Sequence, residues 1–232
     1  MALQHNPKIV TDGLVLCLDA GNPLSYSGSG TAWNDLSGNG NNGTLTNGPT
    51  YSSDNKGNII CDGIDDVIIS SNNTNISGDF NATLSIWVNF ISVSSNWNCA
   101  IQFGDVGSVQ GFAIFQGGDW GSSALVVGFY GGKAGYITNS ITDNVWTNLV
   151  ATKTSGAIGS TTTKLYKNGQ SLSLTFNSSL IPNASNDKLR IGNDQANENA
   201  NIKVGSAMLY NRALTASEVL QNYNATKGRY AL

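Results

Sequence analysis

Residues 82–91 read Ala-Thr-Leu-Ser-Ile-Trp-Val-Asn-Phe-Ile, and this stretch decides the fold class. Apolar and other side chains alternate along it. One face would carry Leu84, Ile86, Val88 and Phe90, and the other Thr83, Ser85, Trp87 and Asn89. Strict alternation with a period of two is typical of a β-strand that packs one face on a core. The sequence therefore predicts a strand over residues 82–91.

Similar short apolar runs, bounded by Gly or Asn, occur along most of the chain. They predict further strands over residues 13–19, 57–61, 67–69, 100–103, 111–116, 124–130, 146–153, 163–166, 170–176, 189–192 and 202–210. Asn168-Gly169 lies between two of these runs, and Asn-Gly in that position favours a tight hairpin turn. The run at 13–19 is continuously apolar, so we expect it to be covered on both faces.

Only the C-terminal region has a helical pattern. Thr215-Ala216-Ser217-Glu218 is a capping box, in which the Thr hydroxyl and the Glu carboxylate satisfy the first turn of a helix. The helix is predicted over residues 216–225. The side chains expected to face the protein are Val219, Leu220 and Tyr223, with Leu214 packing against the first of them.

The composition narrows the class of protein further. The 232 residues are 12% charged, with a net charge of −3, whereas ordinary domains are about 25% charged. Such a charge balance argues against nucleic-acid binding. No apolar run reaches the roughly 18 residues of a membrane span, and the first residues have no apolar core typical of a signal peptide. Asn, Gly, Ser and Thr favour turns, while five Trp, seven Phe and eight Tyr argue against disorder.

These patterns predict an all-β protein. We expect one domain over residues 13–232, a two-sheet antiparallel β-sandwich with one short C-terminal helix. Residues 1–12 would form an N-terminal arm that adds a strand to a neighbouring copy, or else a frayed end. Cys17, Cys61 and Cys99 are an odd number, which argues against a disulfide framework. Cys17 and Cys61 lie in apolar runs, so we expect them to be small buried residues of strands, with a Cys17–Cys61 bridge as the alternative. The absence of a CxxC motif argues against zinc.

Several longer motifs follow one another in a specific order. They are GLVLCLDAGNP (13–23), WNDLSGNGNNGTLTNGPTY (33–51), CDGIDDVI (61–68), ATLSIWVNF (82–90), VWTNLVATK (145–153), KLYKNGQ (164–170), LRIGN (189–193) and AMLYNRALTASEVLQNYNATKGRY (207–230). Together they resemble the laminin-G-like, concanavalin A-like lectin/glucanase jelly rolls, from about residue 13 to residue 230. The style is similar to stand-alone members of this family in tailed phages, including cyanophages. Cys17, Cys61 and Val67 stand where the family usually has aromatic residues.

The resemblance implies a curved sandwich with one concave sheet, frequent glycan binding, a frequent calcium ion and, in some branches, polysaccharide hydrolysis. The hydrolytic branches carry Glu-x-Asp-x-x-Glu on one strand, which this sequence lacks. Of its two Glu residues, Glu218 belongs to the capping box and Glu198 to an Asn-rich segment. Asp65 and Asp66 are adjacent and would point to opposite faces of an extended chain, so they make a poor acid–base pair. His5, the one His, lies near the N-terminus. We therefore predict that the protein is not an enzyme.

Two clusters of turn residues offer oxygen ligands for calcium. They are Asp35, Asn39 and Asn41 in the first cluster, and Asp62, Asp65 and Asp66 in the second. Calcium takes six to eight oxygen ligands and tolerates irregular loops. The alternative is that these side chains cap turns through their own backbone.

Aromatic side chains in polar segments are the candidates for sugar contact. Trp97 and Trp120 lie in polar loops outside the shared motifs, and Asp119 precedes Trp120. We predict a glycan- or partner-binding patch formed by Trp97, Asp119, Trp120, Tyr130 and Tyr136, with Trp87 on the second face of its strand as a further candidate. Trp33 and Trp146 are expected to pack in the core.

Two functions from different classes fit the sequence. The first is a non-catalytic phage virion protein, a capsid decoration, cement or fibre subunit that docks on other virion proteins or on copies of itself and is assembled in the host cytoplasm. The second is a carbohydrate-binding module for attachment to a host surface. A surface lectin of a bacterium and a polysaccharide hydrolase remain as weaker alternatives.

Overall fold

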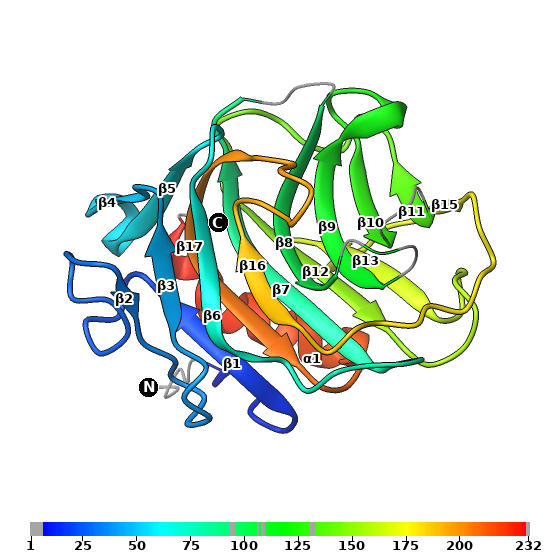
Figure 1. The fold of residues 1–232 in the computed structure, drawn as a ribbon, viewed down its shortest axis with the longest axis horizontal. Coiled ribbons are helices and arrows are strands. Elements are labelled where there is room, and N and C mark those ends of the chain that lie inside the picture. Colours follow the sequence, from blue (N-terminus) through cyan, green and yellow to red (C-terminus); the bar gives the residue numbers. More distant parts are fainter. Residues whose placement is uncertain (1–6, 93–95, 106, 108–109, 130–132, 231–232) are drawn as a thin grey trace, which may run out of the picture.

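The computed structural model describes residues 7–92, 96–105, 107, 110–129 and 133–230 (Figure 1). Within them, two antiparallel sheets stack into a sandwich, and one α-helix, α1 (Ala216–Thr226), packs behind it. The predicted all-β sandwich with a short C-terminal helix is confirmed.

The described strands divide into a back sheet and a front sheet in the view of Figure 1. The back sheet runs in the order β14 (Gln170–Ser171), β13 (Thr163–Lys167), β12 (Thr147–Lys153), β7 (Ala82–Phe90), β17 (Asn201–Tyr210), β5 (Asn58–Asp62) and β4 (Thr50–Ser52), and β1 (Leu14–Asp19) also pairs with β17. The front sheet runs in the order β15 (Thr175–Phe176), β11 (Lys133–Ile137), β10 (Leu125–Phe129), β9 (Gly111–Gly117), β8 (Trp97–Gly104), β16 (Lys188–Ile191), β6 (Val67–Asn73), β3 (Gly43–Thr46) and β2 (Ala32–Trp33). Three short 3-10 helices connect strands or end the chain, namely η1 (Asp54–Lys56), η2 (Gly118–Trp120) and η3 (Lys227–Arg229).

The main core lies between the two sheets. The apolar face of β7 enters it, as its alternation predicts, and meets the inward-facing side chains of β8 and β9. The fully buried members of these three strands include Leu84, Ile86, Phe90, Ile101, Phe103, Phe112 and Ile114. Each such side chain contributes about 1.5–3 kcal/mol by leaving water, so this interface dominates the stability of the sandwich.

A second cluster covers the outer face of the back sheet. Val219 of α1 packs there with Tyr210, Met208 and Val150, and Cys17 of β1 lies beside them. Every residue of β7 is consequently buried, including those on its second face. The expectation that β1 is covered on both faces is confirmed, since Leu16 and Leu18 enter the main core while Cys17 enters this second cluster.

The capping box forms as predicted. The Glu218 backbone N–H donates to Thr215 Oγ1 at 3.3 Å, and the Thr215 N–H donates to Glu218 Oε2 at 2.8 Å. Leu214 and Val219 are both buried in the second cluster. Leu220, which we predicted to face the protein, is 38% exposed, while the polar Asn222 is buried instead. Asn222 takes this place because it hydrogen-bonds to the N-terminal segment.

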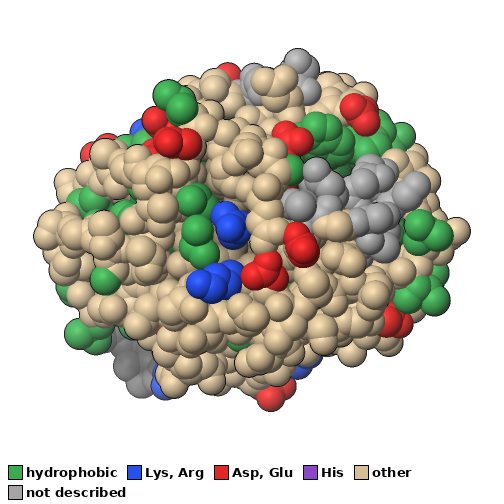
Figure 2. Space-filling model, in the orientation of Figure 1, with side chains coloured by type: hydrophobic (Ala, Val, Ile, Leu, Met, Phe, Trp, Pro, Cys, Tyr) green, Lys and Arg blue, Asp and Glu red, His purple; other side chains and the backbone are tan. Residues whose placement is uncertain are grey.

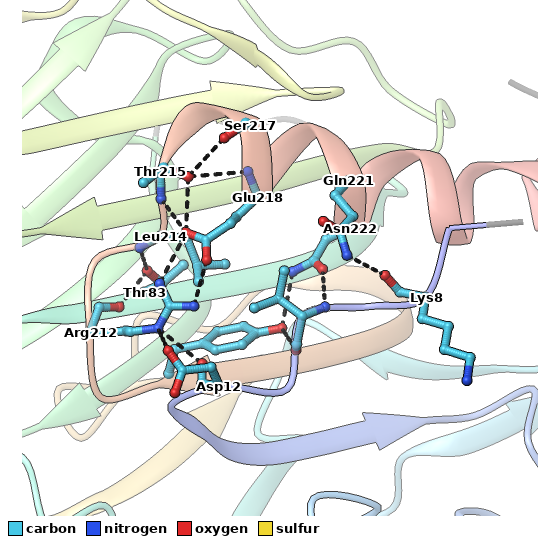
Figure 3. A network of polar contacts seen from close by, with 12 residues as sticks. Lys8, Asp12, Thr83, Arg212, Leu214, Thr215, Ser217, Glu218, Gln221 and Asn222 are labelled. Carbon is cyan, nitrogen blue, oxygen red and sulfur yellow. Dashed lines mark hydrogen bonds and ion pairs between the residues drawn. The ribbon is translucent and has the colours of Figure 1, made fainter.

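Residues 8–12 of the predicted N-terminal arm bind the body of the same chain (Figure 3). Val10 N–H donates to Asn222 Oδ1 at 2.8 Å, and Tyr210 Oη donates to the Val10 carbonyl at 2.9 Å. Gln221 donates to the Lys8 carbonyl at 2.7 Å. The segment thus binds α1 and β17 of its own chain. Residues 1–6 lie outside the described part.

Arg212 connects the segment to the helix (Figure 3). Its guanidinium binds both Glu218 carboxylate oxygens, at 3.0 and 2.6 Å, and contacts Asp12 Oδ2 at 2.8 Å. Bidentate Arg–carboxylate pairs are among the stronger charged hydrogen bonds. The arrangement lowers the pKa of Glu218 to about 2, chiefly through the hydrogen bonds from Arg212.

Some strand predictions differ from the structure. Four strands were missed, namely β2, β3, β4 and β11. The predicted run at 170–176 divides into β14, which belongs to the back sheet, and β15, which belongs to the front sheet. Asn168 and Gly169 both have positive φ, 52° and 77°, and they form the predicted hairpin turn between β13 and β14.

The three thiols are buried and free, so the prediction of small buried residues holds for Cys17 and Cys61. Burial and the nearby Asp19 and Asp35 raise the pKa of Cys17 to about 12. Among the described residues, no helix has the length and hydropathy to cross a membrane.

Candidate functional site

A row of side chains crosses the outer face of the front sheet. Cys99 of β8 pairs with Phe115 of β9, Phe115 with Val126 of β10, and Val126 with Tyr136 of β11. Residues directly opposite one another on neighbouring strands point to the same face. Cys99, Phe115 and Val126 are buried and form a cluster separate from the main core. An apolar row on the outside of the sandwich needs a cover of its own.

That cover is supplied by Trp97, Trp120 and Tyr136, which are partly buried on the row and which we call the aromatic platform. The rings of Trp120 and Tyr136 stack with centroids 4.4 Å apart and an interplanar angle of 17°. Trp97 meets Trp120 edge to face at 5.4 Å. Offset stacked and edge-to-face contacts are the favoured geometries of aromatic pairs, so the three rings support one another.

Local backbone geometry sets the positions of the two indoles. Trp97 opens β8, where it pairs with Gly117, and Trp120 ends η2, directly after β9. Gly118 lies under Trp97, and a Cβ placed there would come 2.6 Å from Trp97 Cε2. Gly118 also has a φ of +78°, which glycine adopts without cost. The sequence Gly117-Gly118 thus lets the Trp97 ring lie against the backbone.

The platform joins three of the residues that the sequence singled out. Trp97 was expected in a polar loop but belongs to β8, because the strand continues outward past a bulge between Cys99 and Ile101. Asp119 is exposed next to Trp120. Figure 2 shows hydrophobic side chains gathered over β8 to β10, with acidic side chains beside them, on a face that is otherwise mostly uncharged. Tyr130, the remaining member of the predicted patch, lies outside the described residues.

The prediction for Trp87 was wrong. Its side chain is 1% exposed and stacks on Tyr230 at 4.0 Å, with Tyr223 at 5.8 Å. Its Nε1 donates to Thr226 Oγ1 at 2.8 Å. The C-terminal helix and the residues after it cover this face of β7, so no ligand can reach the indole. Trp33 is fully buried, as predicted.

A carboxylate pair beside the platform was not predicted. The Glu198 carbonyl accepts the Cys99 N–H at 3.0 Å, which places the loop after β16 against β8. Burial raises the pKa of Asp194, and burial together with Asp194 raises that of Glu198. Asp194 Oδ1 accepts the N–H groups of Ala196 and Glu198, and Oδ2 is completely buried. Asp194 therefore shapes the loop and cannot contact a substrate.

Three of the predicted calcium ligands come together in the turn between β5 and β6. One carboxylate oxygen each of Asp62, Asp65 and Asp66 lies within 4.8 Å of the others. Asp66 is buried, which raises its pKa, while its Oδ2 accepts the Asp62 N–H at 3.0 Å. Hard oxygen donors of this kind suit calcium. The three carboxylates therefore fit a calcium ion, and calcium binding at this turn stays a prediction.

Asp35 and Asn39 do not join this carboxylate cluster. Asp35 Oδ1 accepts the N–H groups of Cys17 and Ser37, and its Oδ2 accepts the Asn41 N–H at 3.0 Å. The Asn39 side chain donates to the Leu14 carbonyl at 3.0 Å. These side chains bind the free edge of β1, which is the capping role given above as the alternative to calcium.

A family model of the concanavalin A-like lectin/glucanases superfamily matches residues 62–220, which is more than half of the chain. The chain belongs to this superfamily. The resemblance drawn from the motifs is confirmed at that level, and the phage style remains a prediction. No curated protein sequence matches this chain significantly.

Solved structures share the fold at low sequence identity. The binding domain of Paraclostridial Mosquitocidal Protein 1 is 22% identical with a TM-score of 0.67, over 93% of this chain and 52% of that chain. Domain 4 of AbnA, a GH43 extracellular arabinanase from Geobacillus stearothermophilus solved with arabinotriose, is 19% identical with a TM-score of 0.64, over 90% and 98%. Trypanosoma rangeli sialidase is 15% identical with a TM-score of 0.67, over 95% and 34%. The protein therefore spans about half the length of the first of these chains and about a third of the length of the last.

Proposed function

We propose that the protein is a non-catalytic carbohydrate-binding module and that the aromatic platform is its sugar-contacting surface. The observation that carries the proposal is the stacked, partly exposed pair Trp120–Tyr136 on the outer face of the front sheet, with Trp97 against its edge. Aromatic rings bind the apolar faces of sugars, and nearby polar groups orient the hydroxyls. The exposed Asp119, which precedes Trp120, offers a carboxylate for such a hydroxyl hydrogen bond.

Two further facts support this choice. Superfamily membership makes a sugar ligand more plausible than for an arbitrary sandwich, and a structural neighbour was solved with arabinotriose. Among the described carboxylates, Glu218 is bound by Arg212 and the Thr215 cap, and Asp194 is enclosed in its own loop. A glycosidase needs two carboxyl groups about 5–10 Å apart and open to the substrate, and neither Glu218 nor Asp194 meets this requirement.

A glycan array that includes arabino-oligosaccharides, read with three purified proteins, tests the proposal. We expect the wild-type protein to bind a defined set of glycans and Trp120→Ala to lose this binding. Trp146→Ala is the matched control, because Trp146 is a partly buried Trp that contacts Tyr230 and directly precedes β12 of the back sheet, whereas the platform lies on the front sheet. Equal glycan binding by Trp120→Ala and the wild type would contradict the proposal, as would no binding by the wild type.

The virion role and a virion location stay predictions. Neither the fold nor the superfamily distinguishes a capsid decoration, cement or fibre subunit from a free module, whereas the platform specifically favours contact with a ligand. Light scattering on the purified chain would show a stable trimer or larger species if the chain assembles on copies of itself.

A further inference from the structure

A polar pocket of about 450 Å³ opens where β1 and the end of β6 meet the turn after Ser37. This is on different strands from the aromatic platform. Half of its lining residues are asparagines, namely Asn39, Asn41, Asn72, Asn75 and Asn211, and none of the lining residues in the described chain is charged or aromatic. Pockets of this size accommodate small ligands.

Three of the asparagines are held in place by hydrogen bonds. Asn39 and Asn41 donate their side-chain N–H groups to the Val15 carbonyl at 3.2 and 2.8 Å. Asn72 donates to the Gly40 carbonyl and to Asn41 Oδ1, both at 3.3 Å. The wall of the pocket is therefore ordered before any ligand arrives, which lowers the cost of binding.

Other polar groups of the same wall have no partner within the described chain. The Oδ1 atoms of Asn39 and Asn72 accept no hydrogen bond there, and the side-chain amides of Asn75 and Asn211 make none. An amide offers one acceptor and two donor hydrogens, so several donors and acceptors are available to a ligand in a small volume.

We propose that this pocket is a second saccharide subsite, which binds a neutral sugar through side-chain amides without ring stacking. An uncharged lining gives an ionic ligand no counter-charge, and paired donors and acceptors match adjacent hydroxyl groups. The choice of a sugar as the ligand class rests on the proposed function. Two subsites on one chain would raise the avidity for a polymer well above that of either subsite.

The test follows both subsites at once by ¹H–¹⁵N NMR, with the methyl glycosides of glucose, galactose, mannose and arabinose as probes. The Trp indole N–H signals report on the platform, and the Asn side-chain NH₂ signals report on the pocket. We expect at least one sugar to shift the Asn75 and Asn211 signals. The double variant Asn75→Gly and Asn211→Ala should weaken this binding about tenfold, because two hydrogen-bonding groups are removed. Glycine at position 75 keeps the left-handed backbone, whose φ is 59°.

Asn183→Ala is the matched control, since Asn183 is exposed and does not line the pocket. It should bind like the wild type. Absence of pocket amide shifts with every sugar would overturn the proposal, as would unchanged affinity in the double variant. Trp120→Ala separates the two proposals. Pocket shifts that persist in this variant support an independent subsite, and their loss would refute it. Indole signals that stay fixed for every sugar would instead count against the platform.

Discussion

Gly118 allows a test that moves the platform while leaving the sandwich in place. It has a φ of +78° and lies under the Trp97 ring, whereas Gly121, three residues on, has a φ of +98° and nothing within 4 Å of the position that a methyl group would occupy. Gly118→Ala and Gly121→Ala both force an alanine to positive φ, and Gly121 also has a ψ of 162°, in a backbone region nearly confined to glycine. Only the first places a methyl group against an aromatic ring.

The expected difference follows from the distances. An alanine in such a sparsely populated backbone region costs about 1–3 kcal/mol, and each variant incurs a cost of this kind. At position 118 the new Cβ would lie 2.6 Å from Trp97 Cε2, against about 3.5–4.0 Å for ordinary carbon contacts, so the indole must shift by roughly 1 Å. Trp97 makes two aromatic contacts, with Phe115 and Trp120, each worth about 0.5–1.5 kcal/mol. Moving the indole should therefore destabilise Gly118→Ala by about 1–3 kcal/mol beyond its backbone strain.

Urea denaturation measures the stability of both variants, and tryptophan fluorescence reports the environment of Trp97. Binding is then measured with the glycans that the wild type retains on the array. We expect Gly118→Ala to bind about tenfold more weakly or worse, a loss of about 1.4 kcal/mol, and Gly121→Ala to bind normally. If Gly118→Ala and Gly121→Ala show the same tryptophan fluorescence and the same glycan affinity, the contact between Gly118 and Trp97 does not set the platform.

Other predictions concern charge, calcium and the thiols. Arg212 holds the pKa of Glu218 at about 2, below its ordinary 4.5, so this stabilisation is complete above about pH 4.5 and is lost as the pH falls toward 2. Glu218→Gln should therefore cost about 1–2 kcal/mol at neutral pH, allowing for solvent screening, and little at about pH 2; urea titrations at both pH values that show a constant difference would contradict this. We propose that calcium raises the melting temperature of the wild type more than that of Asp65→Asn, and calorimetry with calcium or a chelator that shows equal shifts would exclude this site. The buried Cys17 thiol, whose pKa is about 12, should react slowly with a disulfide reagent in the native protein and rapidly in urea, and fast reaction of the native protein would show that the thiol is accessible.

Local patterns predicted the parts of the fold that local chemistry controls. The alternation over residues 82–90, the Asn168-Gly169 turn and the Thr215–Glu218 capping box all depend on residues close in sequence, and all three form as expected. The strands that were missed are short or rich in Gly and Thr, such as Gly43–Thr46. They are held by pairing with distant strands, and that pairing leaves no periodic signal in so short a segment.

The candidate site was predicted in its residue types and only partly in its geometry. Trp97, Trp120 and Tyr136 are brought together because β8, β9 and β11 share one sheet, and no spacing rule links residues 97 and 136. Asp35 has the residue type of a calcium ligand. Its carboxylate oxygens, however, accept hydrogen bonds from the backbone N–H groups of Cys17 and Asn41. Distinguishing a ligand from a turn cap requires knowing which strand edge lies beside the side chain.

Trp87 and Trp97 show how the outer faces of the two sheets differ in accessibility. Both indoles project from the outer face of a sheet, and both contact other aromatic rings. Trp87 is closed off because α1 and Tyr230 return to the back sheet, where Arg229 holds the chain end by donating to the carbonyls of Asn55 and Gly57. No helix in the described chain covers the front sheet in the same way, so its aromatic cover consists of side chains from the sheet and η2. The front sheet thus presents, among the described residues, stacked rings that are supported from below and partly exposed, which is what the proposed sugar-binding surface requires.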